Sequence, residues 1–400
     1  MKDAHKVLTI ALLSRVLVIA VMVISSFLFA YVTTKHMDVK EMNMPFFGMF
    51  MRWDSEYYLN IAKHGYPLGY PNIHTFPTKT GTGSPMPSKV ADNLWAFFPF
   101  YSVAMAAVAV GFRRFLTLTP SLMVSGIIVS NIAFFVSAYF FYKLTRKLFD
   151  SRLAMIATAF YCFWVGGVFF STIYSEALFM ALALGAFYFL ADDNLPIAVI
   201  LGFLASFTRS DGFLIFIPFL VYGVMQLKKN KLQSLKLLIS SAIIASPYLI
   251  FNIMGYFLAG GVFPVQLIAR ESNWGTYPLL IKQFTAPYVT VPRFQAFDVL
   301  GIVLVLLPMG YFFLNVRKIF TAEARTIGYW AFYGAMAYVL FTNSVVSSIL
   351  RYAIPMLPIY WVFAKIYVKS RVAGTVLFGV TTAMLIVGAY LLETANPYFM

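Results

Sequence analysis

Charged side chains are scarce in this chain: only 11% of its 400 residues are Asp, Glu, Lys or Arg, and 15 are acidic. A soluble domain carries about 25% charged residues, so the composition excludes an ordinary soluble protein. The single cysteine, Cys162, excludes an intrachain disulfide and suggests no thiol metal site. The sequence also has no Gly-rich phosphate loop, no HExxH motif and no solenoid-type repeat, which argues against a soluble nucleotide-binding unit, a zinc protease or a repeat array.

Hydrophobic residues make up 61% of the chain, with 42 phenylalanines. Apolar runs of about 20 residues recur, which is the length that a helix needs to cross the hydrocarbon of a bilayer. The sequence therefore predicts an all-α polytopic membrane protein that forms a single domain over residues 1–400. The first run is too long for a signal-peptide core and is expected to be a retained helix. The runs are 7–32, 96–112, 121–142, 153–171, 177–191, 196–227, 232–258, 298–315, 326–343, 353–368 and 372–392.

The net charge of +15 has its origin in short basic loops between the apolar runs. Such loops set membrane orientation, so the charge does not indicate a nucleic-acid partner. The basic N-terminus is expected in the cytoplasm, with long loops at 33–95 and 259–297 outside. The basic segment 143–152 is cytoplasmic only if 96–112 does not cross and 196–227 turns back at "TRSDG". This arrangement gives about eleven transmembrane helices.

The first external loop contains "FFGMFMRWDSEYYLNIAKHGY", residues 46–66. Apolar residues repeat at three and four over 44–64, which predicts an amphipathic helix at the membrane surface. A carboxylate beside hydrocarbon is costly and normally faces water, a partner or a site. The candidate site residues here are Arg52, Trp53, Asp54 and Glu56. The alternatives are that the two acids only solvate the helix and that Trp53 is an interfacial anchor. The Pro/Gly/Thr-rich stretch that follows reads as irregular loop.

Three further segments contain charged residues within apolar sequence. They are Glu176 in "YSEALF", Arg209 and Asp211 in "LASFTRSDG", and Arg351 in "RYAIPMLP". The structural alternatives are a helix cap at Glu176, an ion pair between Arg209 and Asp211, and snorkelling of Arg351. The functional alternative is phosphate binding by a planar guanidinium. Under the eleven-helix topology all of them face the same side of the membrane as Asp54. Arg15, inside the first run, is expected to snorkel, and His64 and His74 lack metal-ligand spacing.

The motif "RWDSEYYLNIAKHGY", followed by "NLWAFFPFY", resembles the opening pattern of the PIG-V family. That family contains the second mannosyltransferase of glycosylphosphatidylinositol assembly and its prokaryotic relatives. "YSEALF", "LASFTRSDG" and "RYAIPMLP" are similar to its later landmarks, in the same order and over about the whole chain. One departure is Asp211, where the family often has Asn. The resemblance implies a GT-C-like helical bundle with a large first extracytoplasmic loop that carries a catalytic carboxylate.

The resemblance further implies an inverting transfer of mannose from a polyprenyl- or dolichyl-phosphate-mannose donor to a glycan or glycolipid acceptor. Asp54 is then the general base, Arg209 and Arg351 contact the lipid phosphate, and Glu176 orients the sugar or a cationic partner. Arg52, Trp53, Glu56 and Asp211 complete the substrate-binding set. The resemblance specifies no cofactor, and a divalent metal stays open because some members of the superfamily use a metal and others do not. The expected location is a prokaryotic cell membrane, or the endoplasmic reticulum membrane in a eukaryote.

Two other classes of protein fit a polytopic chain. A transporter or lipid flippase would show internal pseudo-symmetry and charged residues at midplane depth in both halves, whereas the sequence shows no repeat and its polar sites gather toward one surface. A non-catalytic membrane subunit that holds a partner enzyme is the third alternative. Substitution of Asp54 in a transfer assay separates the three.

Overall fold

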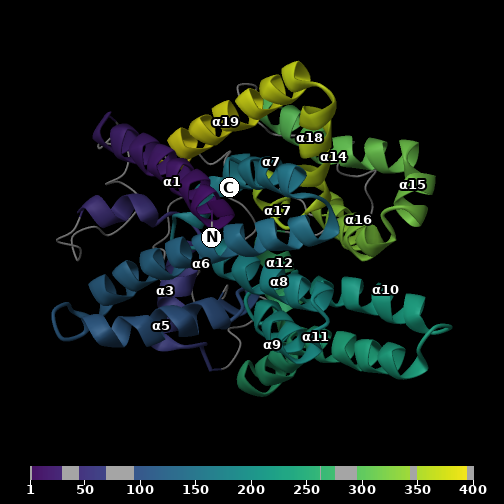
Figure 1. Ribbon diagram of the computed structural model, residues 1–400. Helices are drawn as coiled ribbons and strands as arrows, with labels where there is room; N and C mark the ends of the chain where they lie inside the picture. The colour runs from purple at the N-terminus through teal and green to yellow at the C-terminus, as the bar shows by residue number, and fades with distance from the viewer. Residues whose placement is uncertain are drawn as a thin grey trace.

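The computed structural model describes residues 2–28, 45–68, 94–261, 263–274, 295–342 and 349–393. Helices account for the secondary structure of these residues, and no strand occurs among them (Figure 1), which confirms the all-helical class. The elements are α1 (Lys2–Leu28), η2 (Pro45–Phe50), α3 (Ser55–His64), η4 (Leu94–Ala96), α5 (Phe100–Phe112), α6 (Leu118–Leu148), α7 (Ser151–Cys162), η5 (Val165–Phe170), α8 (Glu176–Ala191), α9 (Leu195–Ser206), η6 (Gly212–Ile215), α10 (Phe216–Gln226), α11 (Lys231–Leu258), α12 (Val265–Trp274), α14 (Gln295–Leu314), α15 (Val316–Thr321), η7 (Ala324–Thr326), α16 (Ile327–Thr342), α17 (Ile349–Tyr352), α18 (Pro358–Lys369) and α19 (Arg371–Glu393).

Helix α6 is the central element of the bundle. It packs against α1, α5, α7 and α8. Beyond α8, each helix packs on the next in the order α8, α9, α11 and α10 (Figure 1). Its inward side chains join an aromatic core in which the rings of Phe141 and Tyr161 stack with centroids 4.9 Å apart. At 1.5 Å per residue, the 31 residues of α6 extend about 46 Å. One long helix thus holds both ends of the molecule in fixed relation.

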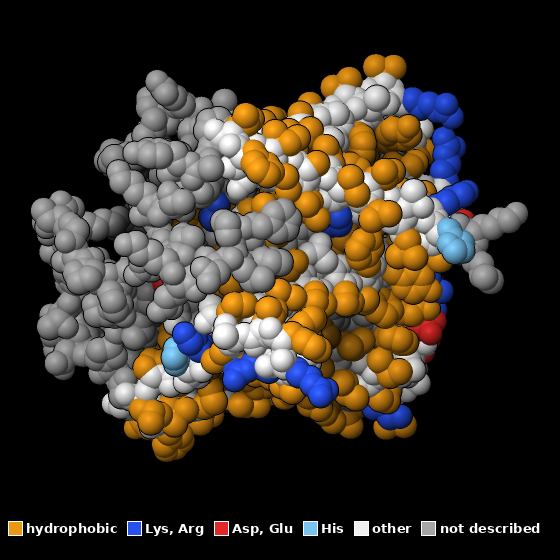
Figure 2. Space-filling view, turned by 90° about the vertical axis from the view of Figure 1, so that its left-hand side faces the viewer, with side chains coloured by type: hydrophobic (Ala, Val, Ile, Leu, Met, Phe, Trp, Pro, Cys, Tyr) orange, Lys and Arg blue, Asp and Glu red, His pale blue; other side chains and the backbone are white. Residues whose placement is uncertain are grey.

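Four helices of the described chain are long and apolar enough to cross a membrane: residues 3–28, 118–148, 231–258 and 371–392. Shorter apolar helices cover 100–112, 176–191, 195–206, 212–226, 299–314 and 327–341. Figure 2 shows a broad apolar surface across the middle of the molecule. These features support an integral membrane protein. The count of about eleven spanning helices stays a prediction.

Charged loops from distant parts of the chain meet at one end of the bundle, which we call the basic end. In Figure 2 Lys and Arg side chains gather along the right-hand edge. The ion pairs at this end are Arg146 with Asp3 (3.4 Å), Lys147 with Asp192, and Lys365 with Glu323 (2.7 Å). The N-terminus and the loops after α6 and α8 therefore lie together, as the orientation argument requires.

One predicted interruption of the helices is confirmed, and the expectation that 96–112 does not cross the membrane stays a prediction. The run 196–227 is divided, because α9 ends at Ser206 and α10 begins at Phe216 after a turn. Helix α5 lies along the first half of α6, where the Tyr101 hydroxyl donates to the carbonyl oxygen of Gly126 at 3.1 Å. A helix of 13 residues in that position does not reach the basic end.

Two predicted helices are wrong. The segment 44–64 is broken between η2 and α3, where Trp53 adopts a positive φ of 50°. The run 153–171 ends as an α-helix at Cys162 and continues as the 3-10 helix η5. Arg15 explains the second break: it is 2% exposed and its guanidinium donates to the carbonyl oxygens of Gly167 (2.6 Å) and Cys162 (3.3 Å). The expectation that Arg15 snorkels is therefore also wrong.

Candidate functional site

Five predicted site residues form one connected network of charges. Arg351 Nη1 lies 2.6 Å from Asp54 Oδ2, and Arg351 Nε donates to Glu176 Oε1. Arg209 Nη1 donates to the same Glu176 oxygen, and Arg209 Nε donates to Asp211 Oδ1 at 3.0 Å. Asp54 and Asp211 are thus linked through two guanidinium groups that share one carboxylate. Because hydrogen bonds between ionised groups are the strong ones, the four chain segments are fixed relative to one another.

A short irregular segment between η2 and α3 positions Asp54. The backbone N–H of Ile173 donates to Phe50 O at 3.0 Å, and the Tyr174 hydroxyl donates to Arg52 O at 2.8 Å. The same hydroxyl accepts from the backbone N–H of Asp54 at 3.3 Å. The positive φ of the preceding Trp53 costs about 1–3 kcal/mol for a bulky residue. These contacts hold the strained turn and place Asp54 at the start of α3.

The Glu176 side of the network depends on the turn between η5 and α8. Ser175 Oγ and the Tyr58 hydroxyl are hydrogen bonded at 2.7 Å, which joins this turn to α3. The helix α17 is fixed to η5, because Trp164 Nε1 donates to Leu350 O at 2.8 Å. Gly166 permits this approach: a Cβ there would lie 2.5 Å from that same Leu350 oxygen. Arg351 is the residue after Leu350, so the same contacts hold its side chain next to Glu176.

Aromatic rings surround the Arg351 guanidinium. Its carbon Cζ lies 4.6 Å from the ring centroid of Tyr174 and 5.0 Å from that of Phe169. Cation–π contacts of this kind contribute about 0.5–2 kcal/mol each, so the rings offset part of the cost of burying the charge. Exposure differs along the network: the side chain of Glu176 is 3% exposed and that of Asp54 is 16% exposed. Asp54 is the most exposed member of the network.

The other predicted residues lie beside the network. Arg52 is buried, and its Nη1 donates to Gly48 O (2.7 Å) and Met51 O (3.0 Å), so it stabilises the turn. Trp53 packs against the core near α1, and its Nε1 has no hydrogen-bond partner in the described part of the chain. Glu56 forms no ion pair with any described residue, and partial burial raises the pKa of its carboxyl group.

Sequence reasoning missed two residues that hold the charged ones in place. Tyr174 and Ser175 form hydrogen bonds at the site, and both stand inside the quoted motif "YSEALF". Gly166 had a weaker signal, a Gly-Gly pair within an apolar run. Among the described residues, no group of three or more His, Cys, Asp or Glu side chains is arranged to hold a metal ion.

The fold and the network define a helical integral membrane protein with ionised groups gathered at the end opposite the basic loops. Comparison with known proteins then shows which family part of the chain is similar to. Residues 88–266 match the family described as mannosyltransferase (PIG-V). The matched range includes Glu176, Arg209 and Asp211, and confirms the resemblance that the motifs predict.

Two relatives carry the same name, GPI mannosyltransferase 2. The protein of Drosophila pseudoobscura pseudoobscura is 27% identical over 198 residues, which cover 44% of this chain and 38% of the relative. The protein of Schizosaccharomyces pombe is 25% identical over 194 residues, which cover 47% of this chain and 35% of the relative. The similarity therefore spans well under half the length of these relatives.

Solved structures of oligosaccharyltransferases from Archaeoglobus fulgidus are also similar to this chain. The structure tethered to an acceptor peptide has a TM-score of 0.43 and 15% identity, over 94% of this chain and 55% of the other. The complex with an inhibitory peptide and a dolichol-phosphate has the same TM-score and identity, over 95% and 55%.

Proposed function

We propose that this chain is a membrane-bound mannosyltransferase of GT-C type. It transfers mannose, with inversion, from a polyprenyl- or dolichyl-phosphate-mannose donor to a glycan or glycolipid acceptor on the extracytoplasmic face. The observation that supports this proposal most is the network itself, in which Asp54 pairs with Arg351 and Glu176 joins Arg351 to a second buried guanidinium group, that of Arg209, at one end of the bundle. The family match and the names of the relatives support the mannosyl group.

Asp54 is the general base of the proposed reaction. The acceptor hydroxyl loses its proton to the carboxylate as its oxygen attacks the anomeric carbon, and the bond from that carbon to the lipid-phosphate oxygen breaks. A single displacement of this kind uses one base and inverts the anomeric centre. Asp54 suits the role because it is the most exposed acid of the network and a positioned base contributes typically about 10²–10⁴-fold.

Arg351 and Arg209 bind the phosphate of the lipid donor. A planar guanidinium matches phosphate geometry and stabilises the charge on the departing phosphate. In the free protein Arg351 donates to both Asp54 and Glu176. A donor phosphate that takes over the contact with Arg351 frees the Asp54 carboxylate for the acceptor hydroxyl. Donor binding and activation of the base are thereby coupled through one side chain, while Glu176 keeps both guanidinium groups in place.

The proposed orientation places the network outside and the basic end in the cytoplasm. Lys147 is a suitable probe because it is exposed at the basic end, and the only native cysteine, Cys162, is buried. Lys147→Cys should react with a membrane-impermeant thiol reagent only after the membrane is opened. Reaction in intact cells would place this loop outside and reverse the assignment of the two faces.

The activity itself is tested with purified protein in lipid nanodiscs. Labelled polyprenyl-phosphate mannose and a membrane glycolipid fraction are the substrates, and the product is analysed for its mannose and its anomeric configuration. The proposal predicts a mannosylated product with inverted configuration. A product with retained configuration would contradict the mechanism, and a preference for nucleotide-linked mannose would contradict the donor.

A further inference from the structure

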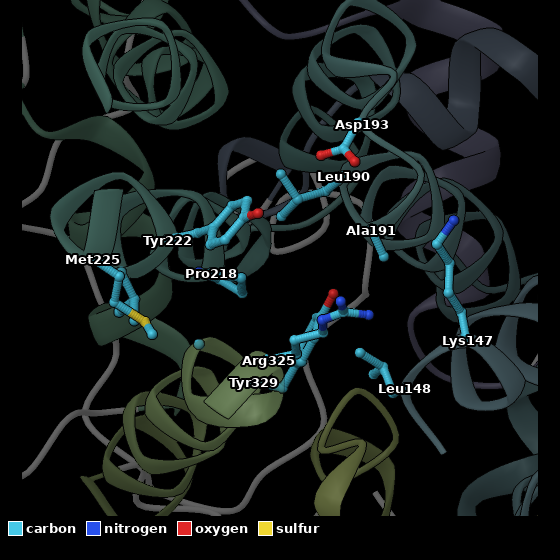
Figure 3. Close-up of a pocket in the computed structure, with 12 residues that line it drawn as sticks. Lys147, Leu148, Leu190, Ala191, Asp193, Pro218, Tyr222, Met225, Arg325 and Tyr329 are labelled. Atoms are coloured by element: carbon cyan, nitrogen blue, oxygen red, sulfur yellow. The ribbon is translucent and has the colours of Figure 1, made fainter. Parts of the chain in front are cut away.

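A cavity lined by both charged and apolar side chains lies at the basic end, on the side of the molecule away from the network. It has a volume of about 210 Å³ and is enclosed by the ends of α6, α8, α10 and α16 (Figure 3). One water molecule needs about 10–15 Å³ by this kind of measure, so the cavity has room for a group of many atoms. Helix α8 separates it from Glu176 by 16 residues, or about 24 Å. The cavity is therefore a separate site.

The charged groups around this cavity balance one another. Lys147 lines the cavity but forms an ion pair with Asp192, which does not line it. Asp193 and Arg325 remain; both are exposed, and neither forms an ion pair with another described residue. Figure 3 shows them on different walls, with the hydroxyl of Tyr222 turned toward the space between them. The cavity thus presents one positive and one negative group that are held apart.

One wall of the cavity is apolar and continues to the outer surface. It is built by side chains of α6, α8 and α10, namely Leu148, Leu190, Pro218, Val221 and Met225. Met225 is 40% exposed, and its neighbours Val224 and Leu227 are exposed at 52% and 46%. Exposed apolar side chains on a helix of an integral membrane protein face lipid chains. The cavity therefore lies where lipid headgroups meet hydrocarbon on the basic side.

We infer that this cavity binds a zwitterionic phospholipid that carries a protonated primary amine. The phosphate accepts hydrogen bonds from Arg325 and Tyr222, the ammonium donates to Asp193, and an acyl chain lies along Met225. Charge complementarity and hydrogen bonding favour this lipid over lipids with anionic or choline headgroups. An anionic headgroup without an amine leaves Asp193 facing negative charge, and a choline headgroup has no N–H to donate to Asp193.

The inference is tested by counting the lipids that stay with the purified full-length protein. The protein is reconstituted in equal mixtures of phosphatidylethanolamine, phosphatidylcholine and phosphatidylglycerol, and the retained lipid is identified by native mass spectrometry. We expect phosphatidylethanolamine to be enriched over the other two. Arg325→Gln and Asp193→Asn should each reduce that enrichment about tenfold, as loss of one charge-assisted hydrogen bond predicts.

Arg317→Gln is the matched control, because Arg317 is exposed on α15 outside the cavity lining. It should leave the enrichment unchanged, and Arg325→Lys should restore part of it. Soluble phosphoethanolamine should compete weakly, because it lacks the acyl chain. Preference for phosphatidylglycerol, equal retention of phosphatidylcholine, unchanged enrichment in both variants, or full competition by the soluble headgroup would each overturn the inference.

Discussion

Replacing Glu176 with glutamine tests whether this residue holds the network together. Its Oε1 accepts from both Arg209 and Arg351, and its side chain is 3% exposed. Glutamine has nearly the same shape but no charge. The variant therefore leaves two buried guanidinium groups with one negative charge fewer between them.

The expected cost follows from the contacts that remain. Loss of one partner from a buried ion pair costs about 3–5 kcal/mol. Arg351 still has Asp54 at 2.6 Å, and Arg209 still has Asp211 at 3.0 Å. The glutamine carbonyl can also accept one of the two hydrogen bonds. We therefore expect a loss near the lower limit, about 3 kcal/mol in the free energy of unfolding.

In the assay, the purified protein is titrated with a denaturing detergent. Its unfolding is monitored by far-UV circular dichroism. Asp192→Asn is the matched control, because it makes the same chemical change in an ion pair whose side chains, Lys147 and Asp192, are 35% and 43% exposed. An exposed pair of this kind contributes about 0–1 kcal/mol. Equal destabilisation by the two variants would refute the view that Glu176 anchors the site.

Three further substitutions, one of them with a matched control, test other parts of the structure. Arg209→Lys keeps the charge but loses the planar guanidinium. We therefore expect the transfer efficiency with the lipid donor to fall about tenfold while the protein stays folded. Unchanged donor kinetics would give Arg209 a purely structural role. Gly166→Ala places a Cβ 2.5 Å from a carbonyl oxygen of α17 and should shift Arg351, lowering the transfer rate about 10²-fold. Gly334→Ala, which meets open space, should leave that rate unchanged. Arg15→Lys should lower the melting temperature, because each lost charge-assisted hydrogen bond costs about 1.5–3 kcal/mol; an unchanged melting temperature would contradict its role in holding η5.

The sequence alone predicts that the charged site residues lie on one side of the membrane. Asp54, Glu176, Arg209 and Arg351 stand out because each is an ionisable group beside apolar sequence, where burial without a partner is costly. The topology argument placed them on one side of the membrane, and the structure joins them with Asp211 into one network. The division of 196–227 followed from the same charge argument.

The contacts within the network could not be predicted in this way. The periodicity over 44–64 predicts an unbroken helix, but hydrogen bonds from Tyr174 hold a turn at Trp53 with positive φ. Arg15 looked like a snorkelling side chain because its acceptors, the carbonyl oxygens of Cys162 and Gly167, lie about 150 residues later in the chain. Tertiary contacts of this kind override local pattern and leave no periodic signal.

The comparison of Asp54→Asn with Glu56→Gln tests the central claim most directly. Both changes remove one negative charge from the same short segment, but only Asp54 contacts Arg351. Glu56 is the competing base, because partial burial raises its pKa toward the range in which a carboxylate accepts protons well. Single-turnover transfer with saturating donor should fall by about 10²-fold or more in Asp54→Asn and only a few-fold in Glu56→Gln. Transfer that survives Asp54→Asn within a few-fold, or a larger loss in Glu56→Gln, would contradict the assignment of Asp54 as the base.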